Sequence, residues 1–180
     1  MPTTIRTLQS AALNLVKKYF NDKYDKGGHS YKEHLYAVAQ AIDDEKKKKV
    51  SDKNSTLAIF YDKCWIVGIL HDILEDTECT VEELKINGFD DEIIEAIQSV
   101  TRKKDEQYYF DFIERVSKND IGRIVKIYDL ENNMDIRRLN EFGEYEQKRL
   151  RKYFYSWKFL KGEINGLSAN NIIHPDRKWR

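Results

Sequence analysis

Residues 54–77 read NSTLAIFYDKCWIVGILHDILEDT, and this segment gives the strongest indication of the fold. Hydrophobic side chains occur in every turn of it, so a helix formed here would be apolar on nearly all sides. Asn54 or Ser55 can cap its start, and the pattern predicts a helix that continues to about Glu75. A helix without a broad polar face belongs in the protein interior. We therefore expect it to be the central helix of the domain.

Four ionisable side chains lie near the end of the same stretch, where His71 and Asp72 are followed by Glu75 and Asp76. Residues four apart share a helical face, so a continuous helix would place His71 beside Glu75 and Asp72 beside Asp76. Three acids this close repel one another unless a cation or a base lies between them. Imidazole and carboxylate ligands together suit manganese, iron or zinc, which favours a divalent metal site. An exposed acidic helix end is the alternative.

The rest of the sequence predicts further helices around this one. The two prolines are Pro2 and Pro175, so no proline breaks the chain between them. Apolar residues recur at three- and four-residue spacings, and most glycines fall between these segments. The prediction is an all-α fold, a single helical bundle, with two short helices that begin near Thr80 and Asp90. We expect the longer helices over residues 4–20, 31–47, 106–118, 121–139 and 143–161.

Two residues elsewhere in the sequence are candidates to complete a metal shell. His34 lies on the apolar side of the helix predicted over residues 31–47, and Asp129 lies within an apolar run of a later helix. Side chains from three separate helices would then converge on one point, as they do at metal sites in helical bundles. Buried charges need partners, and no lysine or arginine lies between His71 and Asp76. A metal site therefore explains the four converging residues, His34, His71, Asp72 and Asp129, better than a purely structural role.

The composition excludes several classes of protein. The chain has 180 residues, with 31 Lys and Arg against 31 Asp and Glu, so no net charge attracts nucleic acid or an anionic membrane. Apolar residues make up 41% of it, which excludes a disordered chain. The longest apolar run, Cys64 to Leu70, is too short to cross a bilayer, and the N-terminus lacks a hydrophobic signal core. We expect a cytoplasmic protein whose two cysteines are reduced.

These residues together resemble a known family. The order His34, His71-Asp72, Asp129 is similar to the ligand set of the HD-domain metal-dependent phosphohydrolases. Residues 71–77, HDILEDT, are more specific, because they look like the hydrolase domain of RelA/SpoT proteins and of the small alarmone hydrolases. The resemblance covers about residues 26–134. The other matching positions are Lys26, Gly28, Tyr31, Val38, Ala39, Thr80, Glu83, Phe89, Val100, Thr101, Lys126, Asn133 and Met134.

The resemblance implies an HD-type domain over residues 1–162, with a C-terminal tail over residues 163–180. It implies hydrolysis of the 3′-pyrophosphate of (p)ppGpp-type alarmones, with release of pyrophosphate and one manganese ion as cofactor. The catalytic residues would be Glu75 and Asp76, which orient and deprotonate the attacking water. The metal ligands would be His34, His71, Asp72 and Asp129, and the nucleotide pocket would be lined by Lys26, Tyr31 and Asn133.

The chain departs from the pattern of this family in two places. Family members have an arginine before the lysine and a proline before the tyrosine, where this chain has Asp25 and Ser30. The usual Asp-Arg-Leu-His-Asn-Met reads DLENNM over residues 129–134, which loses the arginine and the histidine. An acid at position 25 is unfavourable near a polyanionic substrate unless a cation compensates for it. The sequence offers Lys23, Lys26 or Arg102.

Three questions about function and partners stay open at this stage. The same metal site could act on another nucleotide or phosphomonoester, or the domain could be a non-catalytic nucleotide-binding or regulatory module. The expected partner is a small nucleotide, with no nucleic acid and no membrane. Aromatic side chains crowd more than one face of residues 143–161, which is typical of a helix wedged between neighbours or of a homo-oligomer contact.

Overall fold

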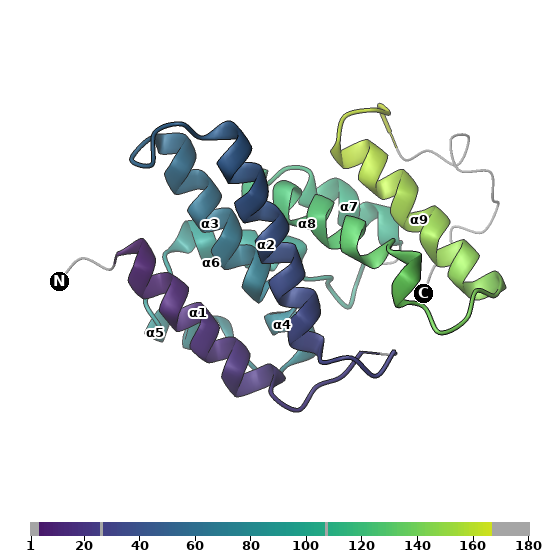
Figure 1. Ribbon diagram of the computed structural model, residues 1–180, viewed down its shortest axis with the longest axis horizontal. Coiled ribbons are helices and arrows are strands. Elements are labelled where there is room, and N and C mark those ends of the chain that lie inside the picture. The colour runs from purple at the N-terminus through teal and green to yellow at the C-terminus, as the bar shows by residue number, and fades with distance from the viewer. Residues whose placement is uncertain (1–3, 26, 107, 167–180) are drawn as a thin grey trace.

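The computed structural model describes residues 4–25, 27–106 and 108–166 (Figure 1). Over these ranges the protein is all-α and contains no β-strand, which confirms the predicted fold class. None of the helices described there is both long and apolar enough to cross a membrane. Lys26 and residues 167–180 of the predicted tail lie outside the described residues. The elements are α1 (Ile5–Phe20), α2 (Tyr31–Lys49), α3 (Thr56–Leu70), α4 (Ile73–Asp76), α5 (Val81–Ile86), α6 (Asp91–Val100), α7 (Tyr109–Val116), α8 (Asp120–Asn133), a 3-10 turn η1 (Ile136–Arg138) and α9 (Glu144–Leu160).

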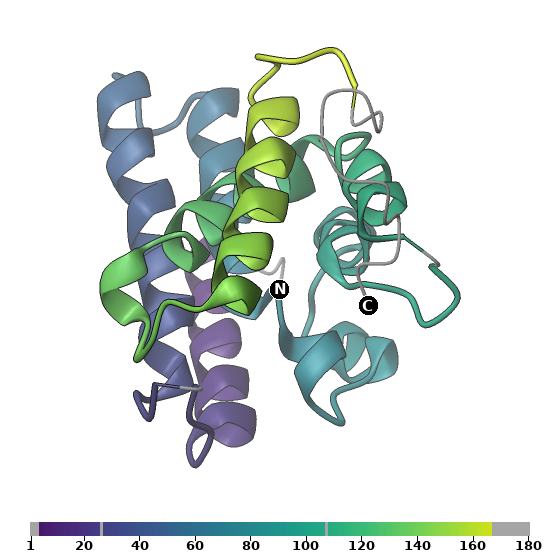
Figure 2. The same cartoon turned by 90° about the vertical axis from the view of Figure 1, so that its right-hand side faces the viewer.

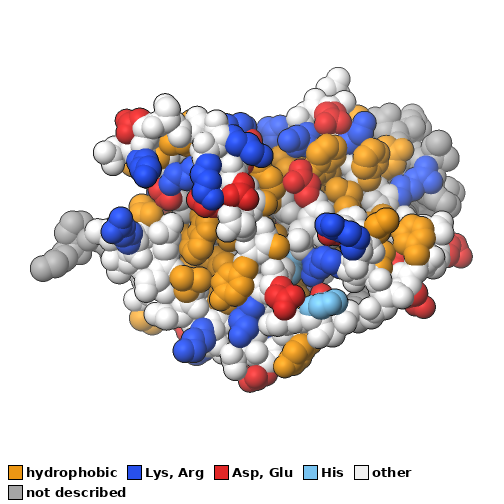
Figure 3. Space-filling view, viewed as in Figure 1, with side chains coloured by type: hydrophobic (Ala, Val, Ile, Leu, Met, Phe, Trp, Pro, Cys, Tyr) orange, Lys and Arg blue, Asp and Glu red, His pale blue; other side chains and the backbone are white. Residues whose placement is uncertain are grey.

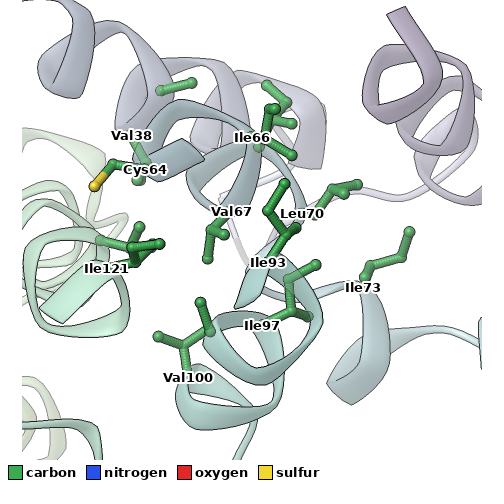
Figure 4. Close-up of a cluster of buried hydrophobic side chains, with 14 of the residues drawn as sticks. Val38, Cys64, Ile66, Val67, Leu70, Ile73, Ile93, Ile97, Val100 and Ile121 are labelled. Carbon is green, nitrogen blue, oxygen red and sulfur yellow. The ribbon is translucent and has the colours of Figure 1, made fainter. Parts of the chain in front are cut away.

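Helix α3 lies at the centre of the bundle, as its apolar sequence predicts. It packs against α1, α2, α6 and α8, while α9 covers α7 and α8 on the far side (Figures 1 and 2). Figure 4 shows Val67 and Leu70 of α3 pointing toward Ile93 and Ile97 of α6. All four side chains are almost completely buried. Burying them removes apolar surface from water, which is the main term that holds the helices together.

A glycine allows α2 and α3 to approach closely. A Cβ atom on Gly68 would lie 2.7 Å from Ile42 Cδ1 and 3.7 Å from Ala39 Cα, so a larger residue there would have to displace the end of the Ile42 side chain. This approach matters for function because α2 carries His34 and the end of α3 leads into His71.

The predicted central helix ends earlier than the sequence indicates. The prediction of one helix through Glu75 is wrong: α3 ends at Leu70, and α4 begins at Ile73. The His71 ring Nδ1 bonds to the Gly68 carbonyl at 2.8 Å, and this carbonyl is the one that the Asp72 N–H would need in a continued helix. His71 and Asp72 therefore occupy a turn, and the expected rows of side chains on one helix do not form.

Two later boundaries also differ from the prediction. The helix expected over residues 106–118 begins only at Tyr109, because Glu106 caps the Lys103 N–H and pairs with Arg115 instead of entering the helix. The helix expected over residues 121–139 ends at Asn133. The Asp135 side chain then accepts the Arg137 N–H and starts the separate turn η1.

Candidate metal centre

Three parts of the chain bring four ligand-type side chains together. His34 comes from α2, His71 and Asp72 from the turn after α3, and Asp129 from α8. The two histidine Nε2 atoms lie 3.1 Å apart. Asp129 Oδ1 lies 3.2 Å from His34 Nε2 and 3.5 Å from His71 Nε2. Asp72 Oδ2 lies 3.0 Å from His71 Nε2 and 3.7 Å from His34 Nε2, which closes the group.

The hydrogen bond of His71 fixes which of its ring nitrogens faces this group. A carbonyl can only accept, so His71 Nδ1 donates to Gly68, and in the neutral ring Nε2 is left with a lone pair. That lone pair points toward His34 Nε2. If the Nε2 atoms of both histidines carry lone pairs, the two lone pairs repel each other unless a proton or a metal ion lies between them. Burial alone would lower the pKa of His71, but the nearby charges of Asp72 and Asp129 raise it well above its usual value, so the site attracts positive charge.

Asp129 is held as a carboxylate by α8 itself. Its Oδ2 accepts from Lys126 Nζ at 2.7 Å and its Oδ1 accepts from Asn133 Nδ2 at 2.5 Å. Burial opposes ionisation, yet Lys126 and the two histidines hold the pKa of Asp129 well below its usual range. The Lys126 side chain is 13% exposed, and although burial disfavours its charge, Asp129 raises its pKa. The pair keeps one oxygen, Oδ1, directed at the histidines.

Three of these residues form a group that fits a small divalent cation, and Asp129 lies beside this group. Ligand atoms of His34, His71 and Asp72 all lie within 4.8 Å of one another, and this group could hold a metal ion. Adjacent ligands of an octahedral ion with bonds of about 2.1 Å lie about 3 Å apart, close to the distances between the Nε2 and carboxylate atoms here. Two imidazoles with carboxylates suit manganese, iron or zinc, and the structure does not single out one of these ions.

Glu75 and Asp76 lie on α4 beside this group. The Tyr31 hydroxyl bridges Asp72 Oδ2 at 2.7 Å and Asp76 Oδ2 at 2.8 Å. Glu75 Oε2 accepts the backbone N–H of Arg102 at 2.9 Å. Burial raises the pKa of both acids, and the charge of Asp72 adds to the rise. Both residues are exposed to the cavity side, but each has a hydrogen-bond partner and is a stronger base than a carboxylate free in water.

The group opens into a cavity of about 680 Å³. Eight acidic residues line it, namely Asp25, Asp72, Glu75, Asp76, Asp129, Asp135, Glu141 and Glu146, together with five basic residues: Arg102, Lys126, Arg138, Arg149 and Lys152. Figure 3 shows histidine, acidic and basic side chains next to one another on one face of the molecule.

The wall formed by α7 and α9 is suited to an anion. Tyr109 Oη and Arg149 Nε line the cavity, are buried, and have no hydrogen-bond partner among the residues that the structure describes. Burial, together with Arg102, Lys126 and Arg149, lowers the pKa of Lys152 to about 8. These groups would be stabilised by a ligand that accepts hydrogen bonds and carries negative charge.

The structure places the predicted pocket residues as follows. Tyr31 and Asn133 line the cavity, but both also hold acids of the central group, which their sequence positions do not indicate. Lys26 lies outside the described residues. Among the described residues Arg138 pairs with Asp25, with Nη2 3.0 Å from Oδ2, and this cation is not one that the sequence indicates.

Sequence reasoning missed Asn132, Arg138, Arg149 and Lys152. Arg138 falls in a segment that the periodicity assigns to a helix, and Arg149 and Lys152 lie in a segment where the aromatic residues are the conspicuous feature. The Tyr109 ring is buried in the core. The feature that suggests a ligand is its hydroxyl group, which has no hydrogen-bond partner among the described residues. No sequence pattern predicts this.

A scan against protein-family models finds no match for this chain. A search of the curated proteins likewise finds no similar protein. The interpretation of the site therefore rests on its geometry and on the resemblance in its motifs.

Proposed function

We propose that this protein is a metal-dependent phosphohydrolase that removes the 3′-pyrophosphate from (p)ppGpp-type alarmones, with manganese as its metal and the cytoplasm as its location. The observation that carries the proposal is the buried group of two histidine Nε2 atoms and two carboxylates, with Glu75 and Asp76 beside it at the acidic side of a cavity that also has basic walls. The fold that this implies is an HD-type helical bundle.

The roles of the residues follow from their positions. His34, His71, Asp72 and Asp129 hold the metal ion. A bound divalent cation would supply concentrated positive charge near the scissile phosphate and would make water a stronger acid. Glu75 and Asp76 orient the attacking water and take its proton, for which their raised pKa values suit them. The single proton of the Tyr31 hydroxyl lies between Asp72 and Asp76 and links the two side chains.

The basic wall supports a substrate with more than one phosphate. Phosphoryl transfer depends mostly on positioning and on neutralising negative charge. Tyr109 and Arg149 line the cavity, and Tyr109 Oη and Arg149 Nε have no hydrogen-bond partner among the described residues. Burial and the neighbouring cations lower the pKa of Lys152 to about 8, and a bound anion would raise it because the anion offsets those cations. A nucleotide carrying a pyrophosphate at each end of the ribose would reach both the acidic and the basic side.

The test is incubation of the chelator-treated protein with ppGpp, with and without added manganese. Ion-exchange chromatography separates the nucleotide and phosphate products. We expect GDP and pyrophosphate in equal amounts, because water adds to phosphorus while the bond to the ribose 3′ oxygen breaks. We expect both products only when manganese is present. Unchanged ppGpp in protein that holds manganese would reject this substrate.

The same experiment separates the other candidate functions. Release of orthophosphate or a nucleoside from a panel of nucleotides would indicate a phosphohydrolase of different specificity. Tight binding of a nucleotide without any turnover would indicate a regulatory module. Retention of both Glu75 and Asp76 next to the metal ligands argues for turnover, because binding alone does not require a base.

A further inference from the structure

The outer nitrogen of His34 has a partner that the proposed mechanism does not use. His34 Nδ1 lies 2.7 Å from Asn132 Oδ1, and the two residues are 98 positions apart in the chain. Asn132 lies on the last turn of α8, close to Asp129 and Asn133. The same amide oxygen accepts a hydrogen bond from Arg138 Nη1.

The chemistry of Arg138 determines the direction of both hydrogen bonds. A guanidinium can only donate, so the Asn132 atom that faces it must be the amide oxygen and not the amide nitrogen. The oxygen in turn can only accept, and it lies 2.7 Å from His34 Nδ1, closer than the 3.5 Å between Nδ1 and Arg138 Nη1, so Nδ1 carries the proton. In the neutral ring His34 Nε2 then has a lone pair, and it points toward His71 Nε2 and Asp129.

Arg138 is itself held in place from the opposite side. Its Nη2 lies 3.0 Å from Asp25 Oδ2, and the other Asp25 oxygen accepts the backbone N–H groups of Gly27 and His29 at 2.8 and 2.9 Å. Burial opposes the charge on Asp25, but these N–H groups and Arg138 lower its pKa, so it stays ionised. The loop before α2 is thereby connected through Arg138 and Asn132 to His34.

We propose that Asn132 is a positioning residue for the metal site: its amide oxygen, oriented by Arg138 and Asp25, keeps the proton of His34 on Nδ1 and leaves Nε2 free to bind the metal. The inference rests on the proposed function, because it assigns His34 as a ligand. Outer partners of this kind typically change metal affinity or activity by about 10- to 100-fold. Although Arg138 lines the cavity, we expect its loss to weaken metal binding more than substrate binding.

The test compares two variants of nearly equal size, Asn132→Asp and Asn132→Leu. The first keeps an acceptor oxygen for His34 and Arg138, and the second removes it. We expect Asn132→Leu to bind Mn²⁺ about 10- to 100-fold more weakly by calorimetry, while Asn132→Asp binds at least as tightly as the parent. Arg138→Met, which leaves the amide in place but unrestrained, should fall between them. Its KM for ppGpp should change less than its Mn²⁺ affinity.

A second measurement reports the proton position itself. Long-range ¹H–¹⁵N correlation spectra of the metal-free protein show which ring nitrogen of each histidine is protonated. His34 should carry its proton on Nδ1 in the parent and in Asn132→Asp, and should lose this preference in Asn132→Leu. Equal Mn²⁺ affinity of the two Asn132 variants, or an unchanged His34 tautomer in Asn132→Leu, would overturn the inference.

These outcomes are separate from those of the proposed function. If ppGpp is not cleaved but the two Asn132 variants differ as expected, the substrate is wrong and the positioning role stands. If the parent binds no Mn²⁺, the metal-dependent function fails, and the tautomer spectra alone decide the role of Asn132. If Asn132→Leu does not fold, Arg138→Met and Asn132→Asp provide the same comparison.

Discussion

Replacing Asp129 by alanine should abolish metal binding and activity together. Asp129 Oδ1 is the carboxylate atom closest to His34 Nε2, so its loss removes a ligand and not merely a support. We expect Mn²⁺ affinity to fall by at least about 100-fold, more than for the loss of an outer partner. The variant should also lose about 3–5 kcal/mol of unfolding free energy, because it leaves the buried ammonium of Lys126 without its carboxylate. Calorimetric Mn²⁺ titration and urea denaturation measure the two effects.

The double variant Lys126→Met with Asp129→Ala separates stability from metal binding. It removes both charges of the pair, and a hydrophobic replacement for a buried ion pair is often neutral or stabilising. We therefore expect its stability to return close to that of the parent while Mn²⁺ binding stays lost. Tight Mn²⁺ binding by the double variant would exclude Asp129 from the metal shell.

Glu75→Gln should keep the metal and lose turnover. The glutamine oxygen can still accept the Arg102 N–H, so α4 stays in place, but an amide cannot take a proton from water. Loss of a general base typically costs 10²- to 10⁴-fold, and we expect kcat for ppGpp to fall by about that factor. Mn²⁺ affinity should stay within about threefold of the parent, because Glu75 is not expected to hold the ion. This change is smaller than the roughly 10- to 100-fold loss of affinity that typically follows removal of an outer partner of a ligand.

An exposed residue provides the control for Glu75→Gln. Glu82 lies on α5, is exposed, and does not line the cavity, so Glu82→Gln makes the same chemical change without touching the site. Its kcat and Mn²⁺ affinity should equal those of the parent. If Glu75→Gln loses Mn²⁺ as severely as Asp129→Ala, Glu75 has a structural role and the proton passes to another group, of which Asp76 is the nearest.

The helices could be predicted because apolar periodicity reports burial directly. Residues 56–70 become the central helix for the reason that their composition suggests. The break at His71 could not be predicted in this way. It arises because the His71 ring takes the Gly68 carbonyl, and a side-chain bond to the backbone leaves no trace in the pattern of apolar residues.

Some residues of the candidate site could likewise be predicted from the sequence, and others could not. His34 and Asp129 could be named from sequence because a polar residue on an apolar face is conspicuous, and the structure brings both beside His71. Asn132 and Arg138 could not, because their importance comes only from contacts across the fold. Asp25 and Arg138 are 113 positions apart, and the apparent conflict of an acid at position 25 is resolved by this distant contact.

The most direct test of the central claim is anomalous diffraction from crystals grown with manganese. We expect one strong manganese peak between His34 Nε2, His71 Nε2, Asp72 and Asp129, at bonding distance from all four, with Glu75 and Asp76 outside the shell. A peak elsewhere, or none in crystals of protein that binds Mn²⁺ in solution, would contradict the assignment of these residues as a metal centre.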